Sequence, residues 1–356
     1  MLKTKCRKSN MNMNNCKMRI VVLFGATGTV GAYAAMALQQ AGYNVVAVGR
    51  RKSDNDFFGN RGMTYVSMDI VNRDSYKVLP QDDVYAVVHL ASAIPARMQG
   101  YHPQTYIDSI LTGTLNVLDY SVSVSANRIV FAQSVADVSY MYGNNVLIPS
   151  DAIQRFPLND DHSVYSICKN AAVNLIEHYY VKYGLKRFVL RFPNIYVYHP
   201  NPFYFYDGLK RWQSYRLLIE RAKQCLPIEL WGNPDLQRDI VYVKDCVQII
   251  EKSLSADVEG GMYNVGTGVG TSMRKQIEGI IDVFSPANHQ SSIIERPENP
   301  DTASYIMDVS KTVNDLGYEP RFDYISYLLD MKKEMEIEPF RDLWGTGCDF
   351  FSGVLE

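Results

Sequence analysis

A strand, a glycine-rich turn and a helix near the N-terminus constrain the fold of this chain more than any other feature. Residues 19–24 (RIVVLF) are apolar and rich in β-branched side chains, which predicts a strand buried on both faces. Residues 25–31 (GATGTVG) follow as a turn, and a helical pattern covers residues 30–41. Glycines also serve ordinary turns, but between a buried strand and a helix they let backbone N–H groups approach a phosphate. The stretch therefore predicts a dinucleotide-binding βα unit.

Strands and helices alternate through the rest of the first half of the chain. Further strands are predicted at residues 44–48, 63–67, 86–90, 128–132 and 187–191, and long helices at residues 104–123 and 164–183. Such alternation forms βαβ units with a parallel sheet covered on both faces. We therefore expect an α/β fold, a Rossmann-type doubly wound parallel sheet with a smaller, mixed α/β C-terminal substrate lobe.

The alternation stops after Asn194, where an aromatic and proline-rich stretch begins. A helix is predicted at residues 323–336, with only short elements and loops before it. The expected divisions are a disordered basic tail at 1–17, an NAD(P)-binding domain at 18–195 with returns near 239–265, a mainly substrate-binding lobe at 196–340, and a C-terminal tail at 341–356. The tail at 1–17 lacks the apolar segment of a secretory signal, and Met18 offers an alternative start.

Charge and cysteine content limit the expected partners. A net charge of -2 over 356 residues gives no basic excess for nucleic acid or an anionic membrane. No apolar run approaches the roughly 20 residues that span a bilayer. The six cysteines are scattered without a CxxC pair, which favours reduced thiols in a cytoplasmic protein over a disulfide framework or a metal site.

The end of the second predicted strand bears on which dinucleotide binds. NAD enzymes usually place an acid there for the ribose 2′-hydroxyl, whereas this chain has Gly49 followed by Arg50 and Arg51. Guanidinium groups pair with a 2′-phosphate, which a carboxylate would repel. Two arginines at a strand end are also compatible with simple solvation, so the pattern favours NADP but leaves NAD open.

A Tyr-x-x-x-Lys pair occupies residues 165–169 (YSICK) in the second long helix. At this spacing Tyr165 and Lys169 lie on one helix face, where the ammonium is expected to lower the pKa of the phenol and make it a general acid or base. Among 25 tyrosines such a pair also arises by chance. Ser134, just past the strand at 128–132, adds context because its hydroxyl would hold the reacting oxygen.

Together these motifs resemble the extended short-chain dehydrogenase/reductase family, in its nucleotide-sugar-modifying, NAD-dependent epimerase/dehydratase branch that includes UDP-glucose 4-epimerase. The turn has that family's G-x-x-G-x-x-G spacing. Further matching segments are VHLAS (88–92), TGTLN (112–116), LRFPNIY (190–196), RDIVYVKD (238–245), YNVGTG (263–268) and DVSK (308–311). The resemblance covers residues 18–320.

The resemblance implies a role for each matching residue. The implied catalytic residues are Tyr165, Lys169 and Ser134. The implied cofactor-binding residues are Gly25, Thr27, Gly28, Thr29, Val30, Gly31, Arg50, Arg51, Asp69, Ile70, Leu90, Ala91, Ser92, Ser109, Tyr165, Lys169 and Phe192. The implied substrate-binding residues are Ser134, Asn194, Arg238 and Arg296, with Arg238 on the diphosphate and Asn194 on the nucleotide-sugar. No metal ligand is implied.

The resemblance also implies a function: a cytoplasmic enzyme of polysaccharide biosynthesis, homodimeric through the helices predicted at 104–123 and 164–183. The leading hypothesis is an NAD(P)-dependent nucleotide-sugar epimerase or 4-ketoreductase with Tyr165 as acid and base. Sugar 4,6-dehydratases of the family carry Asp-Glu after the catalytic Ser/Thr, and the Val135-Ala136 pair here argues against dehydration. The alternative from another class is a catalytically silent NADP-binding regulatory protein, although such proteins lose the tyrosine or lysine. The sugar and the nucleotide stay open.

Overall fold

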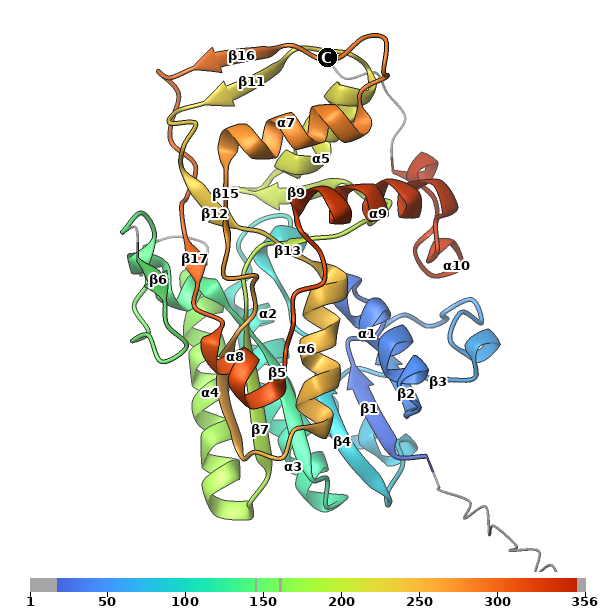
Figure 1. Ribbon diagram of the computed structural model, residues 1–356. Coiled ribbons are helices and arrows are strands. Elements are labelled where there is room, and N and C mark those ends of the chain that lie inside the picture. The colour runs from blue at the N-terminus through green and yellow to red at the C-terminus, as the bar shows by residue number, and fades with distance from the viewer. Residues whose placement is uncertain (1–17, 145, 160–161, 351–356) are drawn as a thin grey trace, which may run out of the picture.

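Seven parallel strands form the central sheet of the computed structural model, which describes residues 18–144, 146–159 and 162–350 (Figure 1). From one edge to the other, the strands are β14 (Gly260–Asn264), β7 (Lys186–Phe192), β5 (Arg128–Ser134), β4 (Val84–His89), β1 (Ile20–Phe24), β2 (Asn44–Gly49) and β3 (Thr64–Ser67). The chain order runs outward in both directions from β1, which is the doubly wound arrangement. The predicted Rossmann-type sheet is confirmed. The tail expected at residues 1–17, like residues 351–356, lies outside the described residues.

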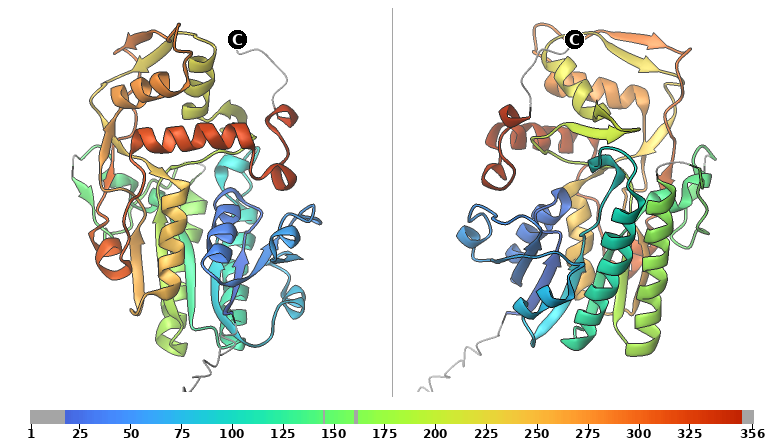
Figure 2. Two further views of the ribbon diagram at one scale, coloured as in Figure 1. Left: turned by 45° about the vertical axis from the view of Figure 1, so that its right-hand side comes forward. Right: turned by 180° about the vertical axis from the view of Figure 1, so that it is seen from behind.

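Both faces of the sheet are buried, because alternate side chains of each strand point to opposite faces. In β1, Val21 and Leu23 join one core cluster, whereas Val22 and Phe24 join another. Helices α1 (Thr29–Gln40) and α6 (Val243–Ser255) pack on the first face. Helices α3 (Gly113–Ser123) and α4 (Ser163–Tyr183) cover the second face, as the view from behind shows (Figure 2).

A mixed α/β lobe stands above the carboxyl ends of the sheet strands (Figures 1 and 2). Its helices are α5 (Ser214–Lys223), α7 (Met273–Phe284), α9 (Tyr324–Ile337) and α10 (Arg341–Trp344). Its paired strands are β9 (Phe203–Tyr206) with β10 (Leu209–Trp212), β11 (Ile228–Trp231) with β16 (Ile293–Arg296), and β12 (Gln237–Asp239) with β15 (Gly270–Ser272). Connecting pairs are β8 (Ile195–Tyr196) with β13 (Val241–Tyr242), and β6 (Leu147–Ile148) with β17 (Ile306–Met307), which α8 (Ser310–Leu316) follows.

The structure departs from the sequence prediction in two helical regions. The helix predicted at residues 104–123 is divided into α2 (Pro103–Tyr106), a π-helical segment η4 (Ile107–Thr112) and α3. Within it the Ser109 hydroxyl donates to the Thr105 carbonyl at 2.7 Å, a local bond that competes with regular helix bonding. The second departure is α6 and α7, which occupy a stretch where only short elements were predicted.

Short 3-10 helices complete the framework. They are η1 (Gly59–Arg61), η2 (Arg73–Val78), η3 (Pro95–Arg97), η5 (Val135–Met141) and η6 (Gly347–Asp349). Of these, η3 follows β4 and η5 follows β5, both at the carboxyl edge of the sheet. Ligands of open α/β sheets collect at that edge, so these two elements border the expected site.

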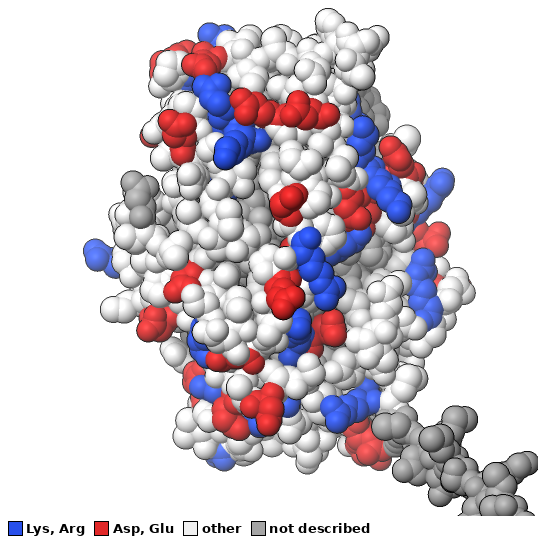
Figure 3. All heavy atoms as spheres, in the orientation of Figure 1, with Lys and Arg blue, Asp and Glu red and all other residues white. Residues whose placement is uncertain are grey.

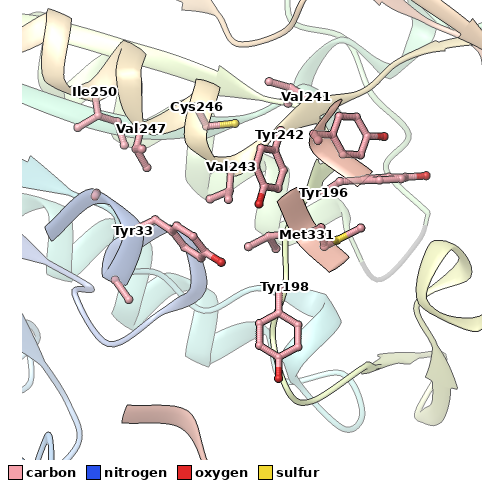
Figure 4. Close-up of a cluster of buried hydrophobic side chains, with 14 of the residues drawn as sticks. Tyr33, Tyr196, Tyr198, Val241, Tyr242, Val243, Cys246, Val247, Ile250 and Met331 are labelled. Carbon is pink, nitrogen blue, oxygen red and sulfur yellow. The ribbon is translucent and has the colours of Figure 1, made fainter. Parts of the chain in front are cut away.

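A buried aromatic cluster joins the sheet half to the C-terminal lobe (Figure 4). Tyr33 comes from α1, Tyr242 from β13 and Met331 from α9, and all three are at most 5% exposed. The Tyr33 and Tyr242 hydroxyls both donate to the Glu334 carboxylate on α9. Because these contacts bury both apolar rings and their hydroxyls, they fix α9 against α1.

The described surface carries a mixture of charges. In the face drawn in Figure 3, basic and acidic side chains are interspersed, in keeping with the net charge of -2. Within the described residues, every helix is too short or too polar to cross a membrane.

Candidate active site

A cavity of about 680 Å³ lies at the carboxyl ends of β1, β2, β3 and β4. The predicted cofactor-binding residues that line it are Gly25, Thr27, Gly28, Thr29, Arg50, Arg51, Asp69, Ile70, Leu90, Ala91, Ser92 and Ser109. They come from loops that are far apart in sequence and meet only because the strands are parallel neighbours. The cavity is large enough for a drug-sized or nucleotide ligand.

The glycine turn is packed so closely that side chains are excluded from it. Gly25 has a φ of +88°, and a Cβ there would lie 2.7 Å from the Ala91 nitrogen. A Cβ on Gly31 would lie 2.0 Å from the Gly25 carbonyl oxygen. Gly28 occupies the N-cap position of α1 and has no side chain that could bond to the first amides of the helix. The N-terminus of α1 can therefore present its free backbone N–H groups to an anion. This cradle fits the diphosphate of a dinucleotide.

Gly49 explains why no acid stands at the end of β2. A Cβ at this position would lie 2.8 Å from both the Oγ1 and the Cγ2 atoms of Thr27. A side chain at this position, such as the carboxylate that NAD enzymes usually carry there, would require the Thr27 side chain to move. Arg50 and Arg51 follow directly and both line the cavity.

Arg51 is fixed at both its backbone and its side chain. Its carbonyl accepts a 2.7 Å bond from the Tyr65 hydroxyl, and its guanidinium donates to the carbonyl of Leu343. Asp69, beyond β3, accepts from the Val71 N–H at 3.0 Å and so also holds a turn. Each of these side chains thus has a local structural role in addition to its position at the cavity.

The structure brings Ser134, Tyr165 and Lys169 together beside the end of β5. The Ser134 side chain lies close enough to the Tyr165 hydroxyl to lower its pKa, and Tyr165 is 8% exposed. Lys169 is 3% exposed and donates from Nζ to the Ala132 carbonyl at 2.7 Å. Its Nζ lies 5.9 Å from the centre of the Tyr165 ring. None of the three lines the 680 Å³ cavity, but β5 is the sheet neighbour of β4, whose C-terminal loop does.

The expected lowering of the Tyr165 pKa is wrong for this arrangement. Burial raises the pKa of Tyr165 to about 12, and the Ser134 hydroxyl offsets only part of that rise. Burial also lowers the pKa of Lys169 to about 7, because the charged ammonium is desolvated. The sequence spacing identified the helix face correctly but could not reveal how completely both groups are buried.

Val30, Gly31 and Phe192 are the remaining predicted cofactor residues, and they also lie outside the cavity lining. Val30 and Gly31 belong to the first turn of α1, where Gly31 allows the close packing against Gly25. Phe192 ends β7 and pairs in register with Ser134. Phe192 is thus placed at the Ser134–Tyr165 end of the site.

A buried ion pair holds the segment that follows Ser134. Arg191 on β7 binds both carboxylate oxygens of Asp137 on η5, at 3.0 and 3.1 Å, and each side chain is 1% exposed. Arg191 also donates to the Asn264 side chain at 3.1 Å. Two neighbouring strands therefore anchor η5 through the buried Asp137 carboxylate.

Asn194 and Arg238, two of the predicted substrate residues, gather around Tyr305. The Asn194 N–H donates to the Tyr305 hydroxyl at 3.4 Å, and the Arg238 guanidinium lies 5.8 Å from the Tyr305 ring centre. Arg238 donates to the Ala303 carbonyl at 2.9 and 3.0 Å and to the Thr302 hydroxyl at 2.6 Å. A second cavity, of about 410 Å³, includes Tyr305 in its lining.

Asp239 does not neutralise Arg238, although it is the next residue. Its buried carboxylate accepts from the Thr267 N–H and hydroxyl and from the N–H groups of Gly268 and Met307. Within the described residues, Arg238 forms no ion pair with a carboxylate. Arg296, by contrast, pairs with Glu229 at 3.2 Å across the outer strands β11 and β16, and the structure does not bring it to Arg238.

Several residues that line the 680 Å³ cavity were missed in the sequence. They include Arg97, Thr105, Asp108, His199, Asn201 and Phe350. His199 accepts the Asn201 N–H on Nδ1 at 3.0 Å, and burial together with nearby arginines lowers its pKa to about 3. His199 and Asn201 stand in the aromatic and proline-rich stretch assigned to the substrate lobe, so local sequence gave no signal for them.

Within the described residues, no group of three or more His, Cys, Asp or Glu side chains is arranged to hold a metal ion. The described cysteines, Cys168, Cys225, Cys246 and Cys348, are free thiols.

The sheet and the glycine cradle define a Rossmann-type nucleotide-binding protein, and comparison with known proteins narrows this class to a family. Residues 21–266 match the sequence model of the NAD dependent epimerase/dehydratase family. The chain belongs to that enzyme family, within the extended short-chain dehydrogenases/reductases.

Relatives and solved structures agree with this assignment. UDP-glucuronate 4-epimerase 1 of Arabidopsis thaliana is 25% identical over 331 residues, which cover 85% of this chain and 73% of the relative. The UDP-glucose 4-epimerase of Thermotoga maritima, solved with UDP-glucose, superposes with a TM-score of 0.70 at 21% identity, over 90% of this chain and 99% of that one. The Thermus thermophilus UDP-glucose 4-epimerase complex with NAD gives a TM-score of 0.68 at 20% identity, over 90% and 99%. At these identities the superpositions establish the common fold.

Proposed function

We propose that the protein is an NAD(P)-dependent nucleotide-sugar epimerase that transfers a hydride at a sugar carbon, with Tyr165 as the acid and base. The observation that carries this proposal is the juxtaposition of Ser134, Tyr165 and Lys169 beside the end of β5. These residues stand one strand away from a cavity suited to a dinucleotide. A relative described as a UDP-glucuronate 4-epimerase and a fold shared with UDP-glucose 4-epimerases support epimerisation.

In the proposed reaction the chain's own residues manage the proton and the sugar oxygen. The nicotinamide, when bound, takes up and returns the hydride. The Tyr165 hydroxyl exchanges a proton with the reacting sugar hydroxyl, while the Ser134 hydroxyl holds that oxygen. Lys169, once protonated, stabilises the Tyr165 phenolate by its charge. With a pKa of about 7 it is close to half-charged at neutral pH.

For the cofactor we propose NADP in preference to NAD. Arg50 and Arg51 at the cavity support the 2′-phosphate, and Gly49 supplies no competing carboxylate. NAD is the cofactor named for the Thermus thermophilus enzyme and is the alternative here. A 4-ketoreductase is the second candidate activity, favoured by the same two arginines because NADPH is the usual cellular reductant.

For the substrate we propose a nucleotide-sugar whose diphosphate binds Arg238 and whose sugar end reaches Asn194. The Arg238 guanidinium has no carboxylate partner among the described residues and lies beside Tyr305, which lines the 410 Å³ cavity, and this supports the assignment. Arg296 remains a proposed second phosphate ligand, although its pairing with Glu229 competes with that role. The β9–β10 hairpin is proposed to cover the bound nucleotide-sugar with its aromatic side chains. Two of these, Phe203 and Trp212, already pack on one another with ring centres 4.9 Å apart.

We further propose a cytoplasmic homodimer formed through α3 and α4. Of the apolar side chains on the two helices predicted to form this interface, Ile110, Leu118, Val173 and Ile176 are buried within one subunit. Ile107 remains 38% exposed, and Leu111 and Leu115 are partly buried. The interface would therefore be narrower than the sequence predicts. Light scattering at micromolar concentration tests it, and a monomer would contradict it.

Product analysis distinguishes the two candidate activities. Purified protein is incubated with a panel of nucleotide-sugars that includes 4-keto-sugars and with NAD⁺, NADP⁺, NADH or NADPH, and the products are followed by NMR. An epimerase gives an equilibrium mixture of two C4 epimers without net cofactor consumption. A 4-ketoreductase consumes one reduced cofactor per 4-keto-sugar reduced, and the absence of turnover with every pair would contradict both.

A further inference from the structure

The C-terminal end of the described chain returns to the dinucleotide cavity. Residues 338–350, here named the C-terminal segment, include α10 and η6. Phe350 lines the cavity, and the indole N–H of Trp344 donates to the Thr27 carbonyl at 3.1 Å. Thr27 belongs to the glycine loop and lines the same cavity. The segment therefore contacts the glycine loop directly and also contributes to the cavity lining.

Trp344 also connects this loop to the C-terminal lobe. It is 4% exposed and packs on Phe340 and His199, with ring centres 4.4 and 4.7 Å away. His199 is itself a cavity residue. One buried indole therefore bridges the loop after β1 and the segment after β8, the two sides of the cavity.

Additional bonds fasten the segment to the end of β2. The Asn55 side chain donates to the Asp342 carbonyl at 2.9 Å, and the Arg51 guanidinium donates to the Leu343 carbonyl. At its start, Glu338 accepts from the Tyr198 hydroxyl and from the Gly347 N–H, each at 3.2 Å. The C-terminal segment thus holds the Arg51 guanidinium in place at the cavity.

We propose that the C-terminal segment is a wall of the cofactor site, and that Trp344 is a positioning residue that holds the glycine loop closed and slows cofactor release. This inference rests on the proposed function. An epimerase must keep its reduced cofactor until the hydride returns to the keto-sugar, because release at that stage would strand the oxidised intermediate. A segment that joins the phosphate loop to the opposite wall of the cavity meets this requirement.

The test measures how fast the intact protein releases bound NADPH or NADH, by the loss of energy transfer from protein fluorescence after mixing with excess competing dinucleotide. Trp344→Phe removes the bond to Thr27 but keeps an aromatic ring against His199. Trp344→Ala removes both contacts. We expect release to accelerate about threefold in the first variant and at least about tenfold in the second, since tenfold corresponds to about 1.4 kcal/mol.

Two further variants separate positioning from loss of folding. Trp231→Ala changes a tryptophan that is 51% exposed on β11, and its release rate should equal that of the unmodified protein. Asn55→Gly removes the exposed bond to Asp342 and tolerates the φ of +53° at this position, and it should accelerate release about twofold. The KM for nucleotide-sugar at saturating cofactor should stay constant in Trp344→Phe, which a general loss of structure would not allow.

The outcomes also distinguish this inference from the proposed function. Unchanged release rates in folded Trp344→Phe and Trp344→Ala would overturn the role of the segment, whatever the enzyme's activity. Faster release in a protein that converts no nucleotide-sugar would support the segment and contradict the proposed function. A protein that binds neither dinucleotide would contradict both.

Discussion

Ser134 lies beside Tyr165 at the point where β5 leads into η5, and its hydroxyl opposes the effect of burial on the pKa of the tyrosine. Ser134 lowers the pKa of Tyr165, whereas burial raises it, and the result is about 12. Tyr165 is consequently a protonated donor near neutral pH. To act as a base it needs the additional positive charge of Lys169, which itself titrates near neutrality.

Ser134→Ala should lower kcat at least about tenfold. The rise of kcat with increasing pH should also shift to higher pH. The reason is that the variant loses the hydroxyl that lowers the Tyr165 pKa, so the phenolate forms at higher pH. Ser134→Thr keeps a hydroxyl and should restore most of the activity and the original pH dependence. A pH profile that is the same in Ser134→Ala as in the unmodified enzyme would exclude this role.

Lys169→Met should raise the free energy of unfolding, and by more at acidic than at alkaline pH. Burial depresses the folded-state pKa of Lys169 from 10.5 to about 7, so between these values the unfolded chain binds the extra proton. The unmodified protein is therefore penalised most below pH 7 and progressively less as pH rises toward 10.5. Denaturant unfolding should show a gain about 2 kcal/mol larger at pH 6 than at pH 9. A gain that is independent of pH would mean that Lys169 is not desolvated in the native protein.

Arg50→Ala combined with Arg51→Ala should weaken NADPH binding far more than NADH binding. Loss of one or two charge-assisted contacts to a phosphate costs roughly 2–4 kcal/mol. Fluorescence titration with each cofactor measures the difference. Lys52→Ala, one position further along and outside the cavity lining, is a control that removes a neighbouring positive charge. Equal losses for both cofactors, or an initial preference for NADH, would refute NADP selectivity.

Arg238→Met should raise the KM for the nucleotide-sugar at least about tenfold and leave NADPH affinity unchanged. Arg238 carries a charge with no carboxylate partner in the described part of the chain, so its removal should affect the diphosphate directly. Arg73→Met, which changes an exposed arginine paired with Asp119, serves as the control. Loss of NADPH affinity with an unchanged KM would assign Arg238 to the other pocket.

The parts of the fold that depend on local sequence were predictable. The unit of β1, glycine turn and α1 follows from an apolar run, three glycines and a helical pattern. In the structure the strand begins one residue later than predicted, and the helix begins and ends one residue earlier than predicted. The Tyr165 and Lys169 spacing likewise fixed a shared helix face. Such features require only neighbours a few residues apart.

Features that depend on distant contacts could not be read from the sequence. Trp344 lies 317 residues from Thr27, and no local pattern indicates that residues 338–350 return to the first loop. The raised pKa of Tyr165 depends on packing from several elements, and spacing to Lys169 alone suggested the opposite direction. The π-helical turn at Ile107–Thr112 similarly reflects packing around Ser109 and Gly113.

The most direct test of the account compares the unmodified enzyme with Tyr165→Phe by NMR of nucleotide-sugar conversion, alongside cofactor titration of both proteins. The substitution removes only the transferable proton and keeps the ring that packs on Tyr106 with centres 5.9 Å apart. We predict a kcat at least about a hundredfold lower, the low end of general acid–base catalysis, with nearly unchanged cofactor affinity. A Tyr165→Phe variant that retains near-native kcat would contradict the assignment of Tyr165 as the acid and base.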